Sequence, residues 1–329
     1  MKRVVVTGGT GFVGANLVRR LIADGHQTHL LVRPQFSSWR IDSIRDRITV
    51  HEVGLSDAAS VASALTAIGP AWVFHLAAYG AYSWQTDEAQ MHETNILGTK
   101  TLVKASIDLG VESFVNTGSS SEYGRPDHAP VETEEVTPDT PYGRTKAIAT
   151  AMCVTAARFG NPTSETTHVA ATRISTLRLY SAYGPFEDPR RLLPSLIVHG
   201  RRGMCPSLVS PQTARDFVHV DDVVDACLLA AQRDGGERGA IYNVGTGVQT
   251  TISEAVEIAR RVLSIPDEPR WGSMSARVWD TDTWVADSRR IRTELGWKPR
   301  YAFEDGFRQM AAWLDEHPEL KDRYEAAWP

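Results

Sequence analysis

Two segments of the chain carry residues whose types and spacing could do chemistry. Residues 7–14 read Thr-Gly-Gly-Thr-Gly-Phe-Val-Gly and follow directly on the apolar run at 4–6. Far downstream, Tyr142 and Lys146 stand four residues apart. A glycine-rich turn can hold the phosphates of a dinucleotide, and a phenol beside an ammonium group can move a proton. Together the two segments indicate redox chemistry with a nicotinamide cofactor.

The glycine-rich segment predicts a strand, a tight turn and the first turn of a helix. Gly8 allows the turn, Gly11 lets the backbone approach a pyrophosphate, and Gly14 lets the helix lie against the strand. The phosphates would face free N–H groups at the helix N-terminus. The cofactor-binding residues predicted in this turn are Gly8, Thr10, Gly11, Phe12, Val13 and Gly14. An ordinary strand-to-helix turn can carry the same glycines. The hypothesis of a dinucleotide site therefore also depends on the second segment.

The Tyr-Lys pair is informative because of what precedes it. On a helix Tyr142 and Lys146 share one face, and the ammonium favours the phenolate, which lowers the pKa of the tyrosine. Such a pair on a solvated helix face would mean nothing by itself. Residues 114–124, however, read Phe-Val-Asn-Thr-Gly-Ser-Ser-Ser-Glu-Tyr-Gly, an apolar strand end that opens into a serine-rich turn. Hydroxyl groups of this turn could bind a substrate oxygen beside the tyrosine.

The elements that must position these groups alternate along the first half of the chain. Apolar runs at 4–6, 28–32, 48–53, 71–76 and 113–117 predict strands, and amphipathic runs at 12–23, 58–68, 96–109 and 142–159 predict helices. Glycines at 25, 69, 110 and 160 are typical helix ends. This alternation predicts an α/β fold with a Rossmann-type, doubly wound parallel sheet. We expect residues 1–180 to form the dinucleotide-binding domain, with a later strand near 240–244 returning to it. Residues 181–329 would form mainly a smaller, interleaved substrate-binding lobe.

Composition narrows the classes of protein that fit. The 329 residues are 42% hydrophobic and 23% charged, enough for a large core, and the net charge of -5 provides no basic field for nucleic acid. The three cysteines, Cys153, Cys205 and Cys227, lie far apart without metal-ligand spacing, so we expect neither a disulfide framework nor a metal. The N-terminus runs into the first strand without an apolar leader or membrane span. We therefore expect a cytoplasmic enzyme that does not bind membranes.

The order of glycine turn, serine turn and Tyr-Lys pair resembles the extended short-chain dehydrogenases/reductases, a family of nucleotide-sugar epimerases, dehydratases and reductases. The resemblance extends over nearly the whole chain. Further matching segments lie at 75–78 (His-Leu-Ala-Ala), 95–99, 177–185, 215–222, 242–245 and 295–299. It implies a nucleotide-diphosphate sugar as substrate and a homodimer that associates through the helices at 96–109 and 142–159. It also implies that Leu76, Ala77 and Ala78 line the cofactor site.

The resemblance assigns roles to the reactive residues. Ser119, five residues before the glycine that ends the serine turn, would polarise the reacting oxygen. Tyr142 would donate or accept the proton, and Lys146 would hold the nicotinamide ribose and lower the pKa of Tyr142. Asn95 could be a structural or a proton-relay residue.

The residues after Ser119 bear on the type of reaction. The family's sugar dehydratases carry an acid and a base one and two places after this serine, where the present chain has Ser120 and Ser121. Neither hydroxyl has a suitable pKa, so reduction or epimerisation remains. The segments at 75–85 and 117–124 are similar to reductases of nucleotide-linked 4-keto-6-deoxy sugars. The main prediction is NADPH-dependent reduction of such a keto group. A 4-epimerase with recycled cofactor is the alternative, and a non-catalytic dinucleotide sensor the second one.

Cofactor choice depends on the end of the predicted second strand. An Asp or Glu there would accept hydrogen bonds from the NAD ribose, but this chain has Arg33. A guanidinium can instead pair with a 2′-phosphate, and Ser37, Ser38 and Arg40 lie near enough in sequence to help. The sequence therefore favours NADP(H) over NAD(H). A solvated Arg33 without such a role is the alternative.

The substrate-binding candidates come from the resemblance and from residue chemistry. Arg215 and Arg277 match phosphate-binding arginines of the family, although surface ion pairs with Asp216 or Asp280 would look the same in sequence. Arg190 and Arg191 are further cationic candidates, and His219 is expected to be a packed structural residue. The full set predicted to contact substrate is Ser119, Ser120, Tyr82, Ser181, Arg215 and Arg277.

Overall fold

The sheet at the centre of the molecule has the strand order of a doubly wound fold. The computed structural model describes residues 1–160, 171–275 and 280–328. Seven parallel strands lie in the order β10-β6-β5-β4-β1-β2-β3. Their bounds are β1 (Arg3–Thr7), β2 (Gln27–Val32), β3 (Thr49–Glu52), β4 (Trp72–His75), β5 (Ser113–Ser119), β6 (Arg173–Leu179) and β10 (Ala240–Val244). The predicted Rossmann-type class is confirmed.

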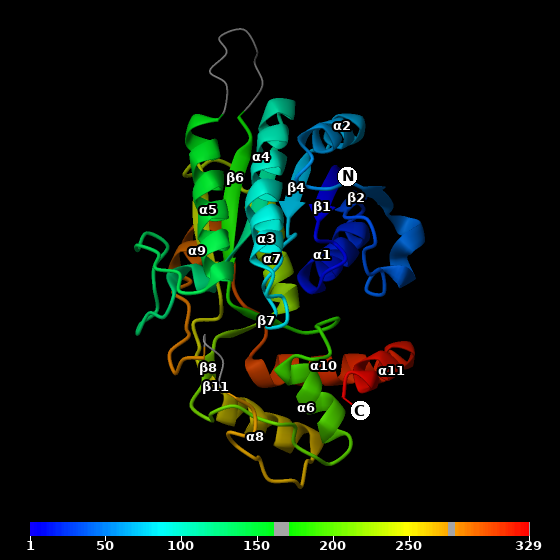
Figure 1. Ribbon diagram of the computed structural model, residues 1–329, viewed down its shortest axis with the longest axis vertical. Helices are drawn as coiled ribbons and strands as arrows, with labels where there is room; N and C mark the ends of the chain where they lie inside the picture. Colours follow the sequence, from blue (N-terminus) through cyan, green and yellow to red (C-terminus); the bar gives the residue numbers. More distant parts are fainter. Residues whose placement is uncertain (161–170, 276–279, 329) are drawn as a thin grey trace.

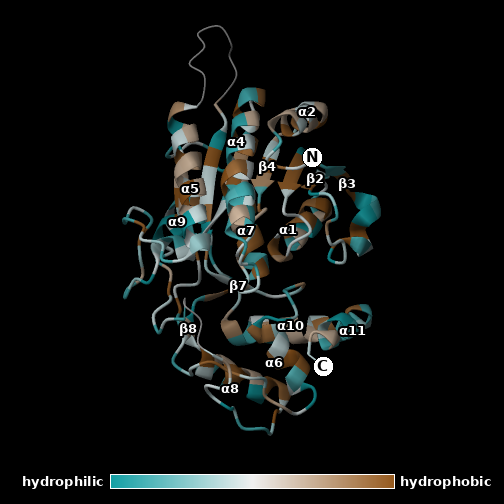
Figure 2. Cartoon of the chain, in the orientation of Figure 1, coloured by the Kyte–Doolittle hydropathy of each residue, from teal (hydrophilic) through white to brown (hydrophobic). Residues whose placement is uncertain are grey.

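Helices cover both faces of this sheet (Figure 1). One face carries α1 (Phe12–Ala23) and α7 (Val220–Gln232), and the other carries α2 (Ala58–Ile68), α4 (Gly98–Leu109) and α5 (Pro141–Phe159). The period of two along β1 decides which side chain faces which layer. Val4 and Val6 pack with α1 and α7, whereas Val5 packs with α2 and α4. Figure 2 shows β1 and β4 as hydrophobic strands between these layers.

The remaining elements form a second lobe, drawn in the lower part of Figure 1. Its helices are α6 (Leu192–Gly200), α8 (Ile252–Leu263), α10 (Phe303–Glu316) and α11 (Pro318–Ala326). Two short sheets pair β7 (Ser181–Tyr183) with β9 (Phe217–His219) and β8 (Ala214–Arg215) with β11 (Thr250–Thr251). The lobe has its own apolar core, and the chain enters it directly after β6 and leaves it again for β10.

Short elements connect these layers. They are η1 (Asp42–Arg47), α3 (Glu88–Met91), the π-helical η2 (His92–Leu97), η3 (Ser120–Tyr123) and α9 (Arg289–Leu295). The helix predicted from residue 96 therefore starts too late, because helical structure already begins at Glu88 and passes through η2 before α4. Within the described residues, no helix is both long and apolar enough to cross a membrane.

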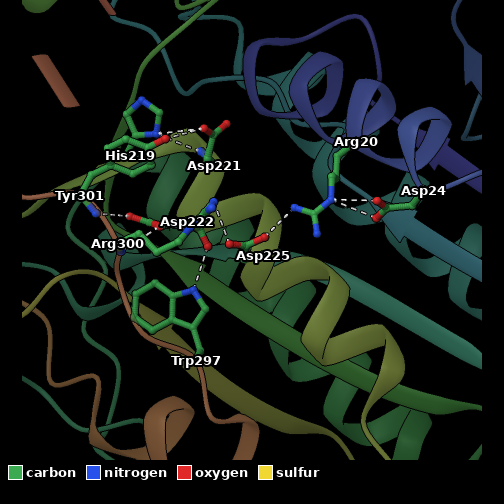
Figure 3. Close-up of polar contacts among 9 residues, drawn as sticks. All are labelled: Arg20, Asp24, His219, Asp221, Asp222, Asp225, Trp297, Arg300 and Tyr301. Atoms are coloured by element: carbon green, nitrogen blue, oxygen red, sulfur yellow. Dashed lines mark hydrogen bonds and ion pairs between the residues drawn. The ribbon is translucent and has the colours of Figure 1, made fainter. Parts of the chain in front are cut away.

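Polar contacts at the N-terminus of α7 fix the last part of the chain to the sheet domain (Figure 3). The carboxylate of Asp222 accepts hydrogen bonds from the backbone N–H groups of Arg300 and Tyr301, at 3.0 and 3.3 Å. The indole of Trp297 donates to the Asp222 carbonyl at 2.8 Å. His219 is buried, caps α7, and has its pKa lowered by burial. The segments at 215–222 and 295–299, which match the family, thus stabilise the structure, in agreement with the structural role predicted for His219.

Candidate active site

The glycine turn lies at the carboxyl edge of the sheet, between β1 and α1. Gly8 has φ +68°, and a Cβ there would lie 2.5 Å from the backbone nitrogen of Ala77. A Cβ on Gly14 would lie 2.1 Å from the Gly8 carbonyl oxygen. Both positions therefore exclude any side chain, one because the turn packs on the end of β4 and the other because α1 packs on the turn.

The first turn of α1 is open to an anion. Gly11 is the N-cap, its N–H bonds to the Gly8 carbonyl, and no side chain of the described residues caps the helix. The N–H groups of Phe12 and Val13 thus lack helical acceptors, and the helix dipole favours negative charge at this place. This cradle fits the pyrophosphate of a dinucleotide.

The end of β4 forms the next wall of the site. His75 donates to or accepts from the hydroxyls of Thr7 and Thr99, at 2.7 and 2.8 Å, and burial lowers its pKa to about 3. A neutral, fixed His75 ends the strand, after which Leu76 and Ala77 are half-buried and Ala78 is exposed beside the glycine turn. Small side chains here leave room above the sheet edge.

The serine turn and α5 are brought into contact by a glycine that the sequence analysis did not single out. Thr140 caps α5 by accepting from the N–H of Gly143 at 3.0 Å. A Cβ on Gly143 would lie 2.5 Å from the carbonyl oxygen of Ser121. Because Gly143 has none, the first turn of α5 packs directly on the serine turn, and Tyr142 meets Ser119.

The electrostatics of Tyr142 differ from the prediction. Burial raises the pKa of its phenol to about 12, while a hydrogen bond with the Ser119 hydroxyl and the charge of Arg191 act to lower it. The predicted lowering by Lys146 is wrong for this arrangement, because the cost of burying a phenolate is the largest influence. The Ser119 hydroxyl also accepts from the N–H of Ser121 at 3.1 Å, so its own proton can be donated.

Lys146 is the residue whose surroundings best fit a cofactor hydroxyl. Its side chain is buried, with 2% exposure, and no group in the described part of the chain forms a hydrogen bond with its ammonium. Burial lowers its pKa, and the carboxylate of Glu122 opposes that effect. A buried ammonium without an acceptor fits the hydroxyls of a nicotinamide ribose.

Asn95 holds the site together from η2. Its side-chain oxygen accepts from the N–H of Tyr79 at 2.9 Å, and its amide donates to the Tyr79 carbonyl and to the Thr145 hydroxyl, at 2.8 and 2.9 Å. These bonds tie the loop after β4 to α5, one residue before Lys146. Of the two roles predicted for Asn95, the geometry favours the structural one.

The loop after β2 carries the residues predicted to lie at the adenosine end of the cofactor. Arg33 and Ser37 are exposed at the sheet edge, where a ribose phosphate could reach them. Arg40 differs from expectation: it is buried, donates to the Phe186 carbonyl at 2.7 Å and stacks on Trp39. Because its guanidinium donates to the carbonyls of Phe186 and, at 3.5 Å, Thr10, Arg40 is engaged inside the protein and not exposed beside Arg33 for a 2′-phosphate.

Aromatic and cationic side chains from two loops meet opposite Tyr142. Tyr82 stacks on Trp84 with ring centroids 4.7 Å apart, and the Arg190 guanidinium lies 3.6 Å from the Trp84 ring. Arg191 lies 5.9 Å from the Tyr82 ring and bonds to Glu187 at 3.4 Å. Its charge acts on the Tyr142 phenol, so Arg191, which sequence reasoning could not rank, lies near the reacting end of the site.

The other residues predicted to contact substrate are Ser120, Ser181, Arg215 and Arg277. Ser120 is buried beside Tyr180 and Trp284 in a small pocket, and Ser181 begins β7. Arg215 donates to Asp280 at 2.8 Å, which is one of the two ion pairs that the sequence left open. Arg277 lies outside the described residues.

No metal or disulfide chemistry emerges from the described part of the chain. There, no three His, Cys, Asp or Glu side chains group as metal ligands. Cys153, Cys205 and Cys227 are buried thiols.

Comparison with known proteins bears on this arrangement. Residues 4–245 match the model of the NAD dependent epimerase/dehydratase family. The chain is 32% identical to a UDP-glucose 4-epimerase of Mycolicibacterium smegmatis over 325 residues. This alignment covers 92% of the present chain and 96% of the relative. The solved UDP-glucose 4-epimerase of Thermotoga maritima with UDP-glucose has a TM-score of 0.84 and 25% identity, covering 96% of this chain and 99% of its own. MoeE5 in complex with UDP-glucose and NAD has a TM-score of 0.80 and 29% identity, covering 96% and 99%.

Proposed function

Because the chain belongs to the NAD dependent epimerase/dehydratase family, we propose that it is a nucleotide-sugar 4-epimerase, with a UDP-linked hexose as substrate. The family predicted from the sequence is confirmed. The narrower likeness to 4-keto-6-deoxy sugar reductases finds no support in the relatives compared, which are named as 4-epimerases or bind UDP-glucose and NAD.

The observation that carries this proposal is the contact of Ser119 with Tyr142 above a dinucleotide cradle. Both side chains lie at the carboxyl edge of a parallel sheet, where ligands of such folds bind. Lys146 follows one helical turn after Tyr142, and in the described part of the chain its buried ammonium has no hydrogen-bond acceptor. A serine donor, a tyrosine acid/base and an anchoring lysine are sufficient for moving one proton between a sugar hydroxyl and the protein.

Ser119, Tyr142 and Lys146 have different roles in the reaction at C4 of the sugar. Ser119 holds the C4 oxygen by donating its free hydroxyl proton, and Tyr142 takes the proton of that oxygen during oxidation and returns it during reduction. Lys146 binds the nicotinamide ribose hydroxyls. When bound, the nicotinamide supplies a hydride acceptor and donor for C4. The keto-sugar must present its other face before the hydride returns, and this inverts C4.

Dehydration is not proposed, because the required acid and base are missing. Ser120 and Ser121 occupy the two places that follow Ser119. Glu122, the nearest carboxylate, is fully buried and bonded to the Ser119 N–H, Thr150 and Arg178, at 2.8, 2.9 and 2.8 Å. It therefore points away from the sugar.

A second candidate, reduction of a nucleotide-linked 4-keto-6-deoxy sugar with NADPH, is favoured by Arg33 alone. An epimerase recycles its bound cofactor, whereas a reductase draws on free NADPH, for which a 2′-phosphate ligand is useful. The two candidates share Ser119, Tyr142 and Lys146 and differ in net cofactor consumption.

Product analysis separates them. We expect purified protein to interconvert UDP-glucose and UDP-galactose, which NMR of the sugar protons would detect. The nicotinamide absorbance should show no net change. If both UDP-hexoses remain unchanged while a 4-keto-6-deoxy substrate is reduced and NADPH is consumed, the reductase replaces the epimerase.

Arg33 is proposed to give the protein a preference for NADP(H) through its 2′-phosphate. Replacing it with glutamine is expected to weaken NADP(H) binding about 10- to 100-fold, the range of one charge-assisted contact, with little change for NAD(H). Arg45→Gln, another exposed arginine after β2, is the matched control and should leave both affinities unchanged. Equal affinities of the native protein for NADPH and NADH would contradict the preference and remove the support for the reductase.

We further propose that the protein is a homodimer through the outer side of η2 and α5. Leu97 and Ile148 are apolar yet 49% and 44% exposed there. Light scattering is expected to give twice the mass of one chain. Ile148→Glu should yield monomers, whereas Val248→Glu, at an exposed apolar residue of the second lobe, should remain dimeric. A monomeric native protein would refute this assembly.

A further inference from the structure

Glu122 is a buried carboxylate that belongs to neither the cofactor site nor the sugar site. It has 0% exposure and lies in η3, directly behind the serine turn. One carboxylate oxygen accepts from the Ser119 N–H and from Thr150, and the other accepts from Arg178. A Cβ on Gly118 would lie 2.5 Å from this carboxylate, so the strand end is shaped around it. Burying an ionised carboxylate costs free energy unless hydrogen bonds and an opposite charge compensate for the lost hydration.

These contacts join the two elements that carry the reactive groups. The bond to the Ser119 N–H completes a capping box that fixes the serine turn. Thr150 lies four residues after Lys146, on the same face of α5, so Glu122 reaches both sides of the Tyr-Lys pair. Glu122 therefore links the serine turn to α5 through hydrogen bonds.

Glu122 also interacts electrostatically with the charged and ionisable groups around it. Arg178 faces it from β6, and Tyr142, Lys146 and Cys153 interact with it electrostatically from α5. Two cations, Arg178 and Lys146, are buried here, and Lys146 has no hydrogen-bond acceptor of its own among the described residues. Among the described residues, Glu122 is the carboxylate whose charge acts on both of these cations.

We propose that Glu122 is a positioning residue for the Tyr-Lys pair: its carboxylate fixes the backbone of Ser119 and supplies the negative charge that keeps Lys146 an ammonium ion inside the protein. This role rests on the proposed function of Ser119, Tyr142 and Lys146. Ionised Glu122 stabilises the protonated forms of both Lys146 and Tyr142, so its loss must favour deprotonation of both.

The pH profile of turnover tests the electrostatic part. Glu122→Gln keeps the shape and an oxygen for the Ser119 N–H but removes the charge. With cofactor and substrate bound, kcat rises with the deprotonation of Tyr142 and falls with the deprotonation of Lys146. Both limbs are expected to move to lower pH by about one unit. Limbs that stay in place while kcat falls would reduce Glu122 to a structural residue.

Glu132→Gln is the matched control. Glu132 is also a buried carboxylate of this region: it accepts from the Asn243 N–H at 2.8 Å, and Arg178 donates to its carbonyl. The charges that act most on Tyr142 and Lys146 include Glu122 but not Glu132. Its variant should leave both limbs at their native pH, and a shift equal to that of Glu122→Gln would contradict a specific role.

A second readout needs no substrate. The ultraviolet absorbance of tyrosinate, taken as the difference from the matching Tyr142→Phe protein, reports ionisation of Tyr142 directly. In Glu122→Gln this ionisation is expected at lower pH, and an unchanged titration would overturn the proposal. Because turnover is not involved, failure here is distinguishable from failure of the epimerase function.

If Glu122→Gln does not fold, the native protein carries the test. The chain has six lysines, so NMR of their Cε groups is tractable, and the signal lost in Lys146→Arg identifies Lys146. Lys146 should remain an ammonium ion through neutral pH. Deprotonation at or below neutral pH would show that Glu122 does not hold its charge.

Discussion

Replacing Tyr142 with phenylalanine is expected to lower kcat for UDP-hexose epimerisation about 10³-fold, within the range of roughly 10² to 10⁴ for a lost general acid/base. The reason is that Tyr142 is the group in contact with Ser119 that can take and return the C4 hydroxyl proton. The ring still fills its place, so the affinities for dinucleotide and UDP-sugar should change little. Steady-state kinetics with dinucleotide titrations separates the two effects.

Tyr301→Phe provides the control for the loss of one phenolic hydroxyl. Tyr301 bonds to Asp221 at 3.2 Å at the N-terminus of α7, away from the serine turn (Figure 3). This variant should retain nearly native kcat. Native turnover in Tyr142→Phe would remove the tyrosine from the reaction.

The second large effect is expected at the glycine turn. Gly8→Ala should weaken dinucleotide binding at least about 100-fold, because the turn must move and phosphate would lose backbone N–H donors. The free energy of unfolding should fall by about 2–4 kcal/mol, since alanine is strained at φ +68° and its Cβ would overlap the backbone of Leu76 and Ala77. Denaturant unfolding and calorimetric titration measure the two quantities.

Gly25→Ala separates backbone strain from steric overlap. Gly25 has φ +78°, close to that of Gly8, but an added Cβ would meet nothing within 4 Å. It should cost only about 1–2 kcal/mol of stability and leave dinucleotide affinity unchanged. Equal losses of affinity in both variants would mean that the glycine turn does not hold the phosphates.

Most strands and helix ends could be predicted because they depend on residues close together in the sequence. The period of apolar residues gave the strands, and α1 and α2 have the predicted bounds, because glycines follow both helices. Gly69 and Gly110 end their helices with positive φ, as expected of such glycines, whereas Gly160 ends α5 with φ -86°. The early start of the helix before α4 was missed, since its π-helical turn depends on the inward bonds of Asn95.

Groups that depend on distant partners could not be predicted in the same way. The environment of Tyr142 is set by burial between two loops, so a spacing rule gave the wrong direction for its pKa. Arg40 was expected beside Arg33, but its partner is Phe186 of the other lobe. The role of Glu122 could not be predicted either, because only its contacts with Thr150 and Arg178 show that it faces the interior.

The most direct test of hydride transfer at C4 uses UDP-glucose deuterated at that carbon. Hydride transfer predicts that the UDP-galactose formed retains deuterium at C4 in ordinary water, because the C4 hydrogen leaves as a hydride and the same hydride returns. Its formation is expected to be slower than from unlabelled substrate. Mass spectrometry and NMR of the product show where the label lies. UDP-galactose that has exchanged its C4 deuterium for solvent hydrogen would contradict the account, since the hydrogen would then have left as a proton.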